Sequence, residues 1–196
     1  MITVRQIERQ WEARAYHRLF CDLMAARPEG VMRLGLDTAG ALPAAAIAVI
    51  RLDELAQPNV KLYSTLVRAI LLAQEGDGGW GDLITTALCL RALLCGEGNG
   101  VAIDRGMTWL AGLQKAEGIW PNIPIRRMAA DSYVSALVLY QLGEHARFRQ
   151  AIRLADAVHW FADNELRLDE ETRNLWNRAR VRCRLQATSQ LVPSLC

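Results

Sequence analysis

A glutamine and a tryptophan recur together along this chain at a fixed distance. Gln74 and Trp80 form the first pair, and Gln114 and Trp120 repeat it 40 residues later with the same internal pattern, Gln-x3-Gly-x-Trp. A fixed period of this size is typical of folds built from repeated supersecondary units. One such unit cannot bury its apolar faces alone, so the sequence predicts units that stack on a shared core.

The hydrophobic residues around the repeats follow a helical period, and strand patterns are nearly absent. The expected helices cover about residues 3–26, 42–55, 60–75, 83–95, 101–115, 130–142, 145–164 and 169–186. No linker rich in Gly, Ser or Pro divides them. We therefore predict one all-α domain over residues 1–196: an N-terminal helix in 1–36, the repeats in 37–165, and a basic C-terminal helix and tail in 166–196.

An aspartate follows each tryptophan and precedes a second, more apolar helix. Asp82 begins the first of these segments and Asp131 the second, and Thr86 aligns with Ser135 inside them. A third, degenerate copy of the repeat has Glu165 in the glutamine position. Each unit is therefore expected to be a helix, an aromatic turn and a helix.

The residue types of the repeat suit structural roles. Glutamine at a helix end can bond carbonyls that lack a partner, and glycine permits positive φ in a tight turn. Tryptophan offers a large apolar plate with one N–H donor, which suits the stapling of adjacent hairpins. We therefore predict that Gln74, Trp80, Gln114 and Trp120 stabilise the fold and do not contact a ligand.

One copy carries more of a recognisable motif than the other. The segment Arg105-Gly106-x2-Trp109-Leu110-x3-Gln114-x3-Gly118-x-Trp120 resembles the full QW motif of squalene-hopene and oxidosqualene cyclases. The copy that ends at Trp80 keeps only the back half of that motif. The resemblance implies the α/α toroid of terpenoid cyclases and protein prenyltransferases, with outer helices at 60–75, 101–115 and 145–164 and inner helices at 42–55, 83–95, 130–142 and 169–186. Because about eight helices are expected, it implies a partial or shortened ring.

The acid motif of the class II terpenoid cyclases is only partly present. Those enzymes protonate an alkene with the middle aspartate of Asp-x-Asp-Asp-Thr-Ala, and this chain has Leu36-Asp37-Thr38-Ala39, with Leu36 in the acid position. Leucine cannot supply a proton, so a retained mechanism needs another carboxylic acid. The catalytic candidates are Asp37, Asp82 and Asp131, although Asp37 also suits a helix start.

The zinc site of the protein prenyltransferases is not reproduced. Its Asp-x-Cys pair aligns best with Asp131-Ser132-Tyr133, where tyrosine replaces the cysteine. The three histidines do not fall at a spacing that joins them to other ligands. We therefore expect no metal and no cofactor.

The predicted C-terminal helix is rich in arginine, and it also carries Trp176. One interpretation is a solvated face whose long stems cover apolar surface. The alternative is that Arg173 and Arg180 hold a diphosphate or carboxylate, together with Arg126 and Arg127 from the loop before the third inner helix. The candidate substrate-binding residues are Tyr133, Trp176, Arg126, Arg127, Arg173 and Arg180.

Composition limits the partners. A formal net charge of +2 gives no general attraction to nucleic acid or to an anionic membrane. The longest apolar run, residues 39–50, is too short to span a bilayer, and we see no signal peptide. The five cysteines form no CxxC pair. We therefore expect a cytoplasmic protein with free thiols and no transmembrane segment.

Three functions are compatible with these patterns. The family resemblance favours a terpenoid-cyclase-like enzyme that acts on an isoprenoid-type apolar substrate in a central cavity, by carboxylic-acid-assisted cyclisation. The incomplete acid and zinc motifs leave its enzymatic status open. The alternatives are a non-catalytic module that binds an apolar ligand, and a structural half-toroid that pairs with a second copy or a catalytic partner protein.

Overall fold

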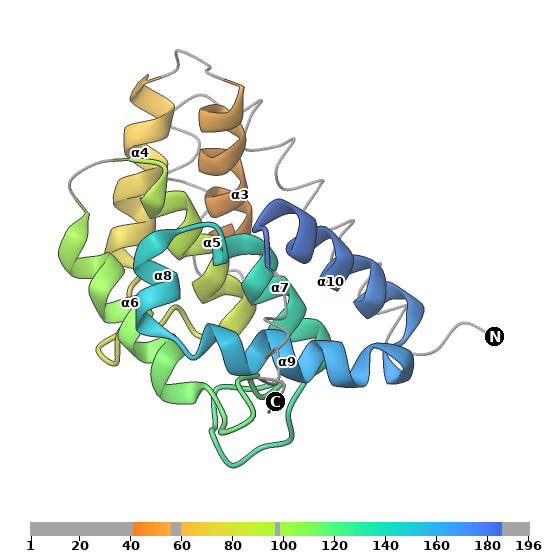
Figure 1. Ribbon diagram of the computed structural model, residues 1–196. Coiled ribbons are helices and arrows are strands. Elements are labelled where there is room, and N and C mark those ends of the chain that lie inside the picture. The colour runs from red at the N-terminus through yellow and green to blue at the C-terminus, as the bar shows by residue number, and fades with distance from the viewer. Residues whose placement is uncertain (1–40, 56–59, 97–98, 186–196) are drawn as a thin grey trace, which may run out of the picture. The chain divides into compact units, whose positions relative to one another are not determined.

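The computed structural model describes residues 41–55, 60–96 and 99–185 of the chain (Figure 1). The predicted helix at 3–26 and the candidate acid Asp37 lie outside these residues. Within them the chain is α-helical and has no β-strand, which confirms that the fold is all-α. The helices are α3 (Ala41–Glu54), α4 (Val60–Leu72), α5 (Leu83–Leu94), α6 (Gly100–Leu113), α7 (Ser132–Leu142), α8 (Ala146–Ala151), α9 (Leu154–Asn164), the short 3-10 helix η1 (Glu165–Arg167) and α10 (Glu170–Arg182).

The chain divides into two compact units, Met1–Gly106 and Met107–Cys196. In the first unit, α3 packs against both α4 and α5. Helix α5 is buried on nearly all sides, with Leu83, Leu90 and Leu93 among its fully buried side chains. A helix that is apolar all round suits a position enclosed by its neighbours, which is what the sequence predicts for an inner helix.

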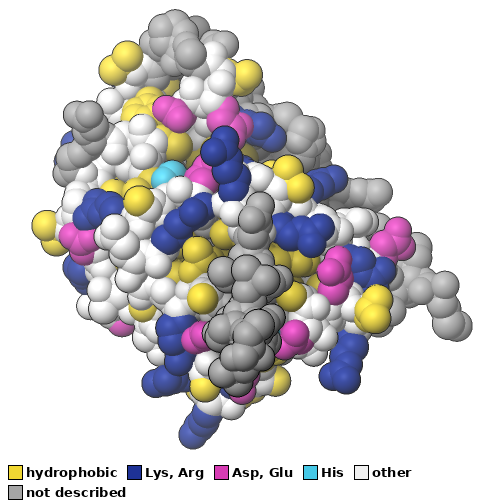
Figure 2. All heavy atoms as spheres, viewed as in Figure 1, with side chains coloured by type: hydrophobic (Ala, Val, Ile, Leu, Met, Phe, Trp, Pro, Cys, Tyr) yellow, Lys and Arg dark blue, Asp and Glu magenta, His cyan; other side chains and the backbone are white. Residues whose placement is uncertain are grey.

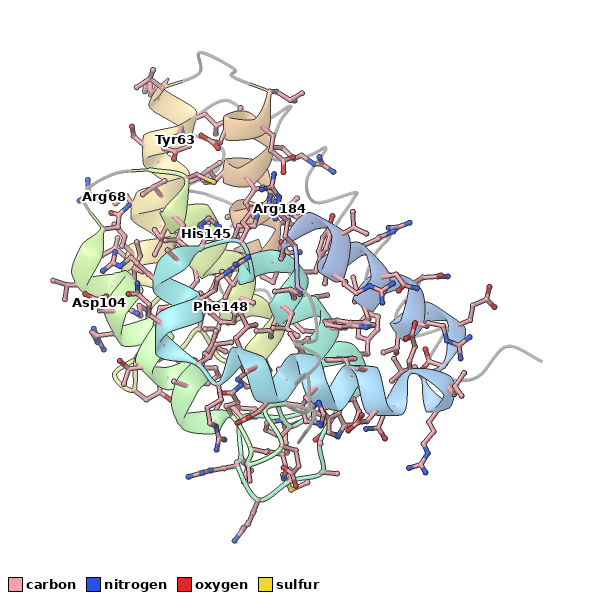
Figure 3. The ribbon with its side chains drawn as sticks, in the orientation of Figure 1. Tyr63, Arg68, Asp104, His145, Phe148 and Arg184 are labelled. Carbon is pink, nitrogen blue, oxygen red and sulfur yellow. The ribbon has the colours of Figure 1, made fainter. Side chains whose placement is uncertain are left out.

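In the second unit, α7 packs against α10, and aromatic side chains fill the core. Phe161 of α9 stacks on Trp176 of α10, with ring centroids 4.4 Å apart. Trp120 stacks on Phe148 of α8 at 6.2 Å, and Phe148 is fully buried (Figure 3). Large apolar plates of this kind contribute most of the burial energy of a small core.

One predicted helix is wrong in the second unit. The segment 145–164 is not continuous but forms α8 and α9, with a break at Ile152 and Arg153. Ile152 is extended there, with φ −119° and ψ 165°. The backbone N–H of Arg153 donates to Gln114 Oε1 at 2.8 Å, so it is taken out of the helical ladder. A side chain 39 residues away therefore ends one helix and starts the next.

Candidate functional site

The two aromatic turns have the same internal hydrogen bonds. Gln74 Nε2 donates to Gly78 O at 2.9 Å, and Gln114 Nε2 donates to Gly118 O at 2.7 Å. The indole N–H of each tryptophan donates to a carbonyl ten residues earlier, at 2.8 Å in both copies. Trp80 and Trp120 are both buried. The stapling role predicted for these tryptophans is consistent with this geometry.

The backbone of each tryptophan is also tied to the helix that follows. Trp80 N donates to Thr86 Oγ1 and Trp120 N to Ser135 Oγ, each at 2.9 Å. These hydroxyls belong to α5 and α7. The sequence alignment of Thr86 with Ser135 is therefore confirmed, and each hydroxyl joins its turn to its helix.

Glycine is required in each turn because another helix approaches closely. Gly78 has φ +101° and Gly118 has φ +84°, values that side chains rarely allow. A Cβ at Gly78 lies 2.8 Å from Arg105 O, and a Cβ at Gly118 overlaps Ala157 N. Glycine at each position therefore permits both the backbone conformation of the turn and the close packing of a later helix, α6 on Gly78 and α9 on Gly118.

Each turn is also held by a residue of the next hairpin. Arg105 donates to Glu75 O at 2.8 Å and to Gly76 O at 3.0 Å. In the second copy, the guanidinium of Arg153 bonds the carbonyls of Gln114 and Lys115. Sequence reasoning missed this pair of clamps, since Asp156 and not Arg153 aligns with Arg105 once Glu165 is matched to Gln114.

The candidate acids Asp82 and Asp131 are helix N-caps. Asp82 Oδ1 accepts from Thr85 N at 2.9 Å and its Oδ2 accepts from Thr85 Oγ1 at 2.6 Å. Asp131 Oδ1 accepts from Tyr133 N at 2.9 Å and Val134 N at 3.0 Å. Asp82 is exposed, whereas Asp131 has only 7% of its surface accessible.

Asp169 caps α10 in the same way, with Oδ1 accepting from Thr172 N at 2.7 Å. Three of the described helices therefore begin on an aspartate that accepts hydrogen bonds from N–H groups at the positive end of the helix dipole. This role uses the carboxylate as an acceptor, whereas a general acid has to carry a proton to its substrate. The cap geometry alone explains why aspartate stands at 82, 131 and 169.

The remaining binding candidates are spread over the second unit. Tyr133 is half-buried in the first turn of α7, and Trp176 is buried in the core against Phe161. Arg173 donates to Glu165 O at 3.2 Å and Leu168 O at 2.8 Å, so its guanidinium closes the turn before α10. Arg180 is exposed on α10.

Arg126 and Arg127 are exposed in the loop of residues 121–130, which extends from its unit between α6 and α7 (Figure 1). The loop is pinned at its base. Asp131 N donates to Trp120 O at 2.8 Å, and Pro121 and Ala130 form an antiparallel bridge. Lys115 Nζ donates to Met128 O at 2.8 Å and to Arg126 O at 3.3 Å. The backbone bonds at its base and the bonds from Lys115 to its carbonyls therefore hold the loop in place.

This loop exposes apolar side chains beside its arginines. The accessible fractions are 39% for Ile123, 43% for Ile125 and 36% for Met128. Elsewhere, basic and acidic side chains intermingle over the face in view (Figure 2). Residue type singled out the two arginines of the loop but not its apolar residues, which the run Ile-Pro-Ile-Arg-Arg-Met at 123–128 contains.

A separate group of ionisable residues lies in the first unit, at the end of α5. Cys95 Sγ donates to Arg91 O at 3.3 Å. Burial, and next to it the nearby carboxylate of Asp53, raises the pKa of the Cys95 thiol to about 12. Arg91 is buried and pairs with Glu54 at 2.8 Å. The thiol is thus held in its neutral form, which is a poor nucleophile.

No protein-family model, curated protein or solved structure matches the chain. Among the residues that the structure describes, no three His, Cys, Asp or Glu side chains gather as metal ligands would. Within the same residues, no helix has the length and apolar character needed to cross a membrane.

Proposed function

We propose that this chain is a non-catalytic helical-repeat module. It pairs with a second copy of itself through the loop of residues 121–130. The observation that carries the proposal is the exposure of Ile123, Ile125 and Met128 on a loop that is pinned at its base. A rigid scaffold that presents an ordered loop is a common way to build a binding surface. Aromatic residues, methionine and arginine are also enriched at protein interfaces.

The first repeat provides an internal comparison for this loop. There a single residue, Gly81, joins Trp80 to Asp82, and Asp82 N donates to Trp80 O at 3.0 Å. In the second repeat ten residues join Trp120 to Asp131, yet the same hydrogen bond forms at 2.8 Å. Closing the hairpin does not need the extra residues, which supports a role for them outside the fold.

The proposal is tested by a variant in which one glycine replaces residues 121–130, as in the first repeat. We expect this variant to keep the helical circular dichroism and cooperative unfolding of the wild type. Sedimentation equilibrium is expected to give a dimer for the wild type and a monomer for the variant. A wild type that stays monomeric across the accessible concentrations contradicts the proposal.

Acid-assisted cyclisation of an isoprenoid is the second candidate. Its support is the resemblance of Asp37-Thr38-Ala39 to the end of the cyclase acid motif, together with the repeated aromatic turns. Since Asp82 and Asp131 act as caps, Asp37 is the acid on which this function depends. Incubation with C10 to C30 polyprenyl diphosphates and with squalene, followed by product analysis, tests it. Turnover that is lost in Asp37→Ala favours the enzyme; no product from the wild type removes it.

A further inference from the structure

We infer that the loop of residues 121–130 docks on the turn between α9 and α10 of a second copy of this chain. This inference rests on the proposed function and adds the surface that receives the loop. We call residues 163–171, which contain η1 and the start of α10, the acidic turn. Both surfaces belong to the second unit, Met107–Cys196, so one copy of that unit carries both.

The acidic turn has an apolar centre. Leu166 of η1 is 94% exposed, the highest accessible fraction among the large exposed hydrophobic residues that the structure describes. Arg173 fixes the conformation of the turn, because its guanidinium donates to Glu165 O and Leu168 O. Leu166 therefore lies on a turn held by hydrogen bonds, and the described residues of its unit leave it exposed.

Opposite charges surround the two apolar centres. The acidic turn contains five acidic residues and one arginine, and the loop of residues 121–130 contains two arginines and no acidic residue. Glu170 is exposed at the start of α10, as Arg126 and Arg127 are in the loop. Complementary charges at the rim of an apolar contact steer association and fix its register. An isoleucine and methionine surface with arginines thus matches a leucine surface with carboxylates.

The spacing of the two surfaces suits a closed pair. The aromatic turn that leads into the loop contacts the start of α9, since Gly118 lies against Ala157. Leu166 of the acidic turn follows Ala157 by nine residues, beyond the other end of α9. At 1.5 Å per residue the base of the loop and Leu166 are roughly 14 Å apart along α9. A twofold axis that crosses α9 therefore brings the loop of each copy to the acidic turn of the other, and forms two equal contacts.

Charge reversal tests this pairing. Arg126→Glu/Arg127→Glu reverses the charge of the loop, and Glu165→Arg/Glu170→Arg/Glu171→Arg reverses that of the acidic turn. Each variant is expected to be monomeric by sedimentation equilibrium, and a mixture of the two is expected to form a heterodimer. The matched control, Arg68→Glu/Arg178→Glu, makes the same charge change as the loop variant at exposed positions outside both surfaces (Arg68 is marked in Figure 3) and is expected to dimerise as the wild type does.

The outcomes separate this inference from the proposed function. If reversal of the acidic turn leaves the dimer intact while loss of the loop abolishes it, the proposed function stands and this receiving surface is wrong. A wild type that stays monomeric overturns both. Circular dichroism and thermal unfolding of every variant keep a folding defect from being read as lost pairing. Binding of the wild type to vesicles of phosphatidylserine and phosphatidylcholine, abolished by Arg126→Glu/Arg127→Glu and without any dimer, assigns the loop to a lipid surface and also overturns the inference.

Discussion

The side-chain amide of Gln114 bonds both backbone groups of Arg153. Its Oε1 accepts from Arg153 N at 2.8 Å, and its Nε2 donates to Arg153 O at 3.2 Å. The same Nε2 also donates to Gly118 O at 2.7 Å. One buried amide therefore shapes the aromatic turn and sets the point where α8 ends and α9 begins.

Replacing Gln114 with glutamate is expected to lower the free energy of unfolding by about 2–4 kcal/mol, because the carbonyls of Gly118 and Arg153 lose the donor that Gln114 supplies from a buried position. Urea unfolding measures the change. Gln74→Glu is the matched control, since Gln74 makes the equivalent bonds but is only half-buried. Gln74→Glu is expected to lower the free energy of unfolding by less than Gln114→Glu does. Equal decreases would argue against burial as the cause.

Gly118→Ala is expected to lower the free energy of unfolding by more than about 2 kcal/mol. The positive φ of Gly118 and its contact with Ala157 both exclude a Cβ. The control is Gly112→Ala in the last turn of α6, where an added Cβ meets nothing within 4 Å. There we expect a gain of up to about 1 kcal/mol from helix propensity. Thermal unfolding of the two variants should move in opposite directions, and a shift of the same sign contradicts this account.

Asp131→Asn is expected to change stability by less than about 0.5 kcal/mol, since the amide oxygen can still cap α7, whereas Asp131→Ala should lose about 1–2 kcal/mol. Chemical unfolding of the three proteins checks this order. The two variants also distinguish a helix cap from a general acid. Both remove the proton that a general acid donates, whereas only Asp131→Ala removes the helix cap.

Stability is expected to fall in alkaline solution because of Cys95. Its pKa is raised to about 12 in the folded protein, mainly by burial, against 9.0 in the reference state. The unfolded chain therefore releases this proton at a lower pH than the folded protein does. The contribution of the protonated Cys95 thiol to the free energy of unfolding is complete below pH 9. It is lost as the pH rises from about 9 to 12.

The alkaline loss is measured from urea unfolding at a series of pH values, with Cys95→Ser as the control. Burial also raises the pKa of Tyr63, so part of the slope above pH 10 is expected to remain in the serine variant. The same thiol should react slowly with iodoacetamide at pH 8. Rapid alkylation of folded protein would show that the thiol is more acidic than this.

Sequence alone predicts the parts of this fold that depend on local pattern. The Gln-x3-Gly-x-Trp spacing predicted both turns, and the aspartate after each turn was expected to begin the next helix, where Asp82 and Asp131 lie. Those features involve residues close in sequence, whose chemistry has few alternatives. The arrangement of the helices as a ring stays a prediction.

The break at Ile152 and the clamp of Arg153 could not be predicted in this way. Both depend on Gln114, and the helical period through 145–164 carries no sign of that distant amide. Exposure of Leu166 was equally hidden, because a leucine among helical residues is expected to face the core. For the candidate site, sequence supplied the residue types but not which carboxylates and guanidinium groups were already occupied by the fold.

The arginine clamps have a consequence for how such a chain can change over evolution. Because Arg105 closes the turn that ends at Trp80, and Arg153 closes the one that ends at Trp120, neither turn is complete within its own hairpin. A duplication or deletion that separates a turn from its clamp leaves carbonyls unpaired and a glycine contact empty. The smallest segment that can be duplicated or deleted therefore runs from one aromatic turn to the arginine that clamps it. Only then does every remaining turn keep its clamping arginine.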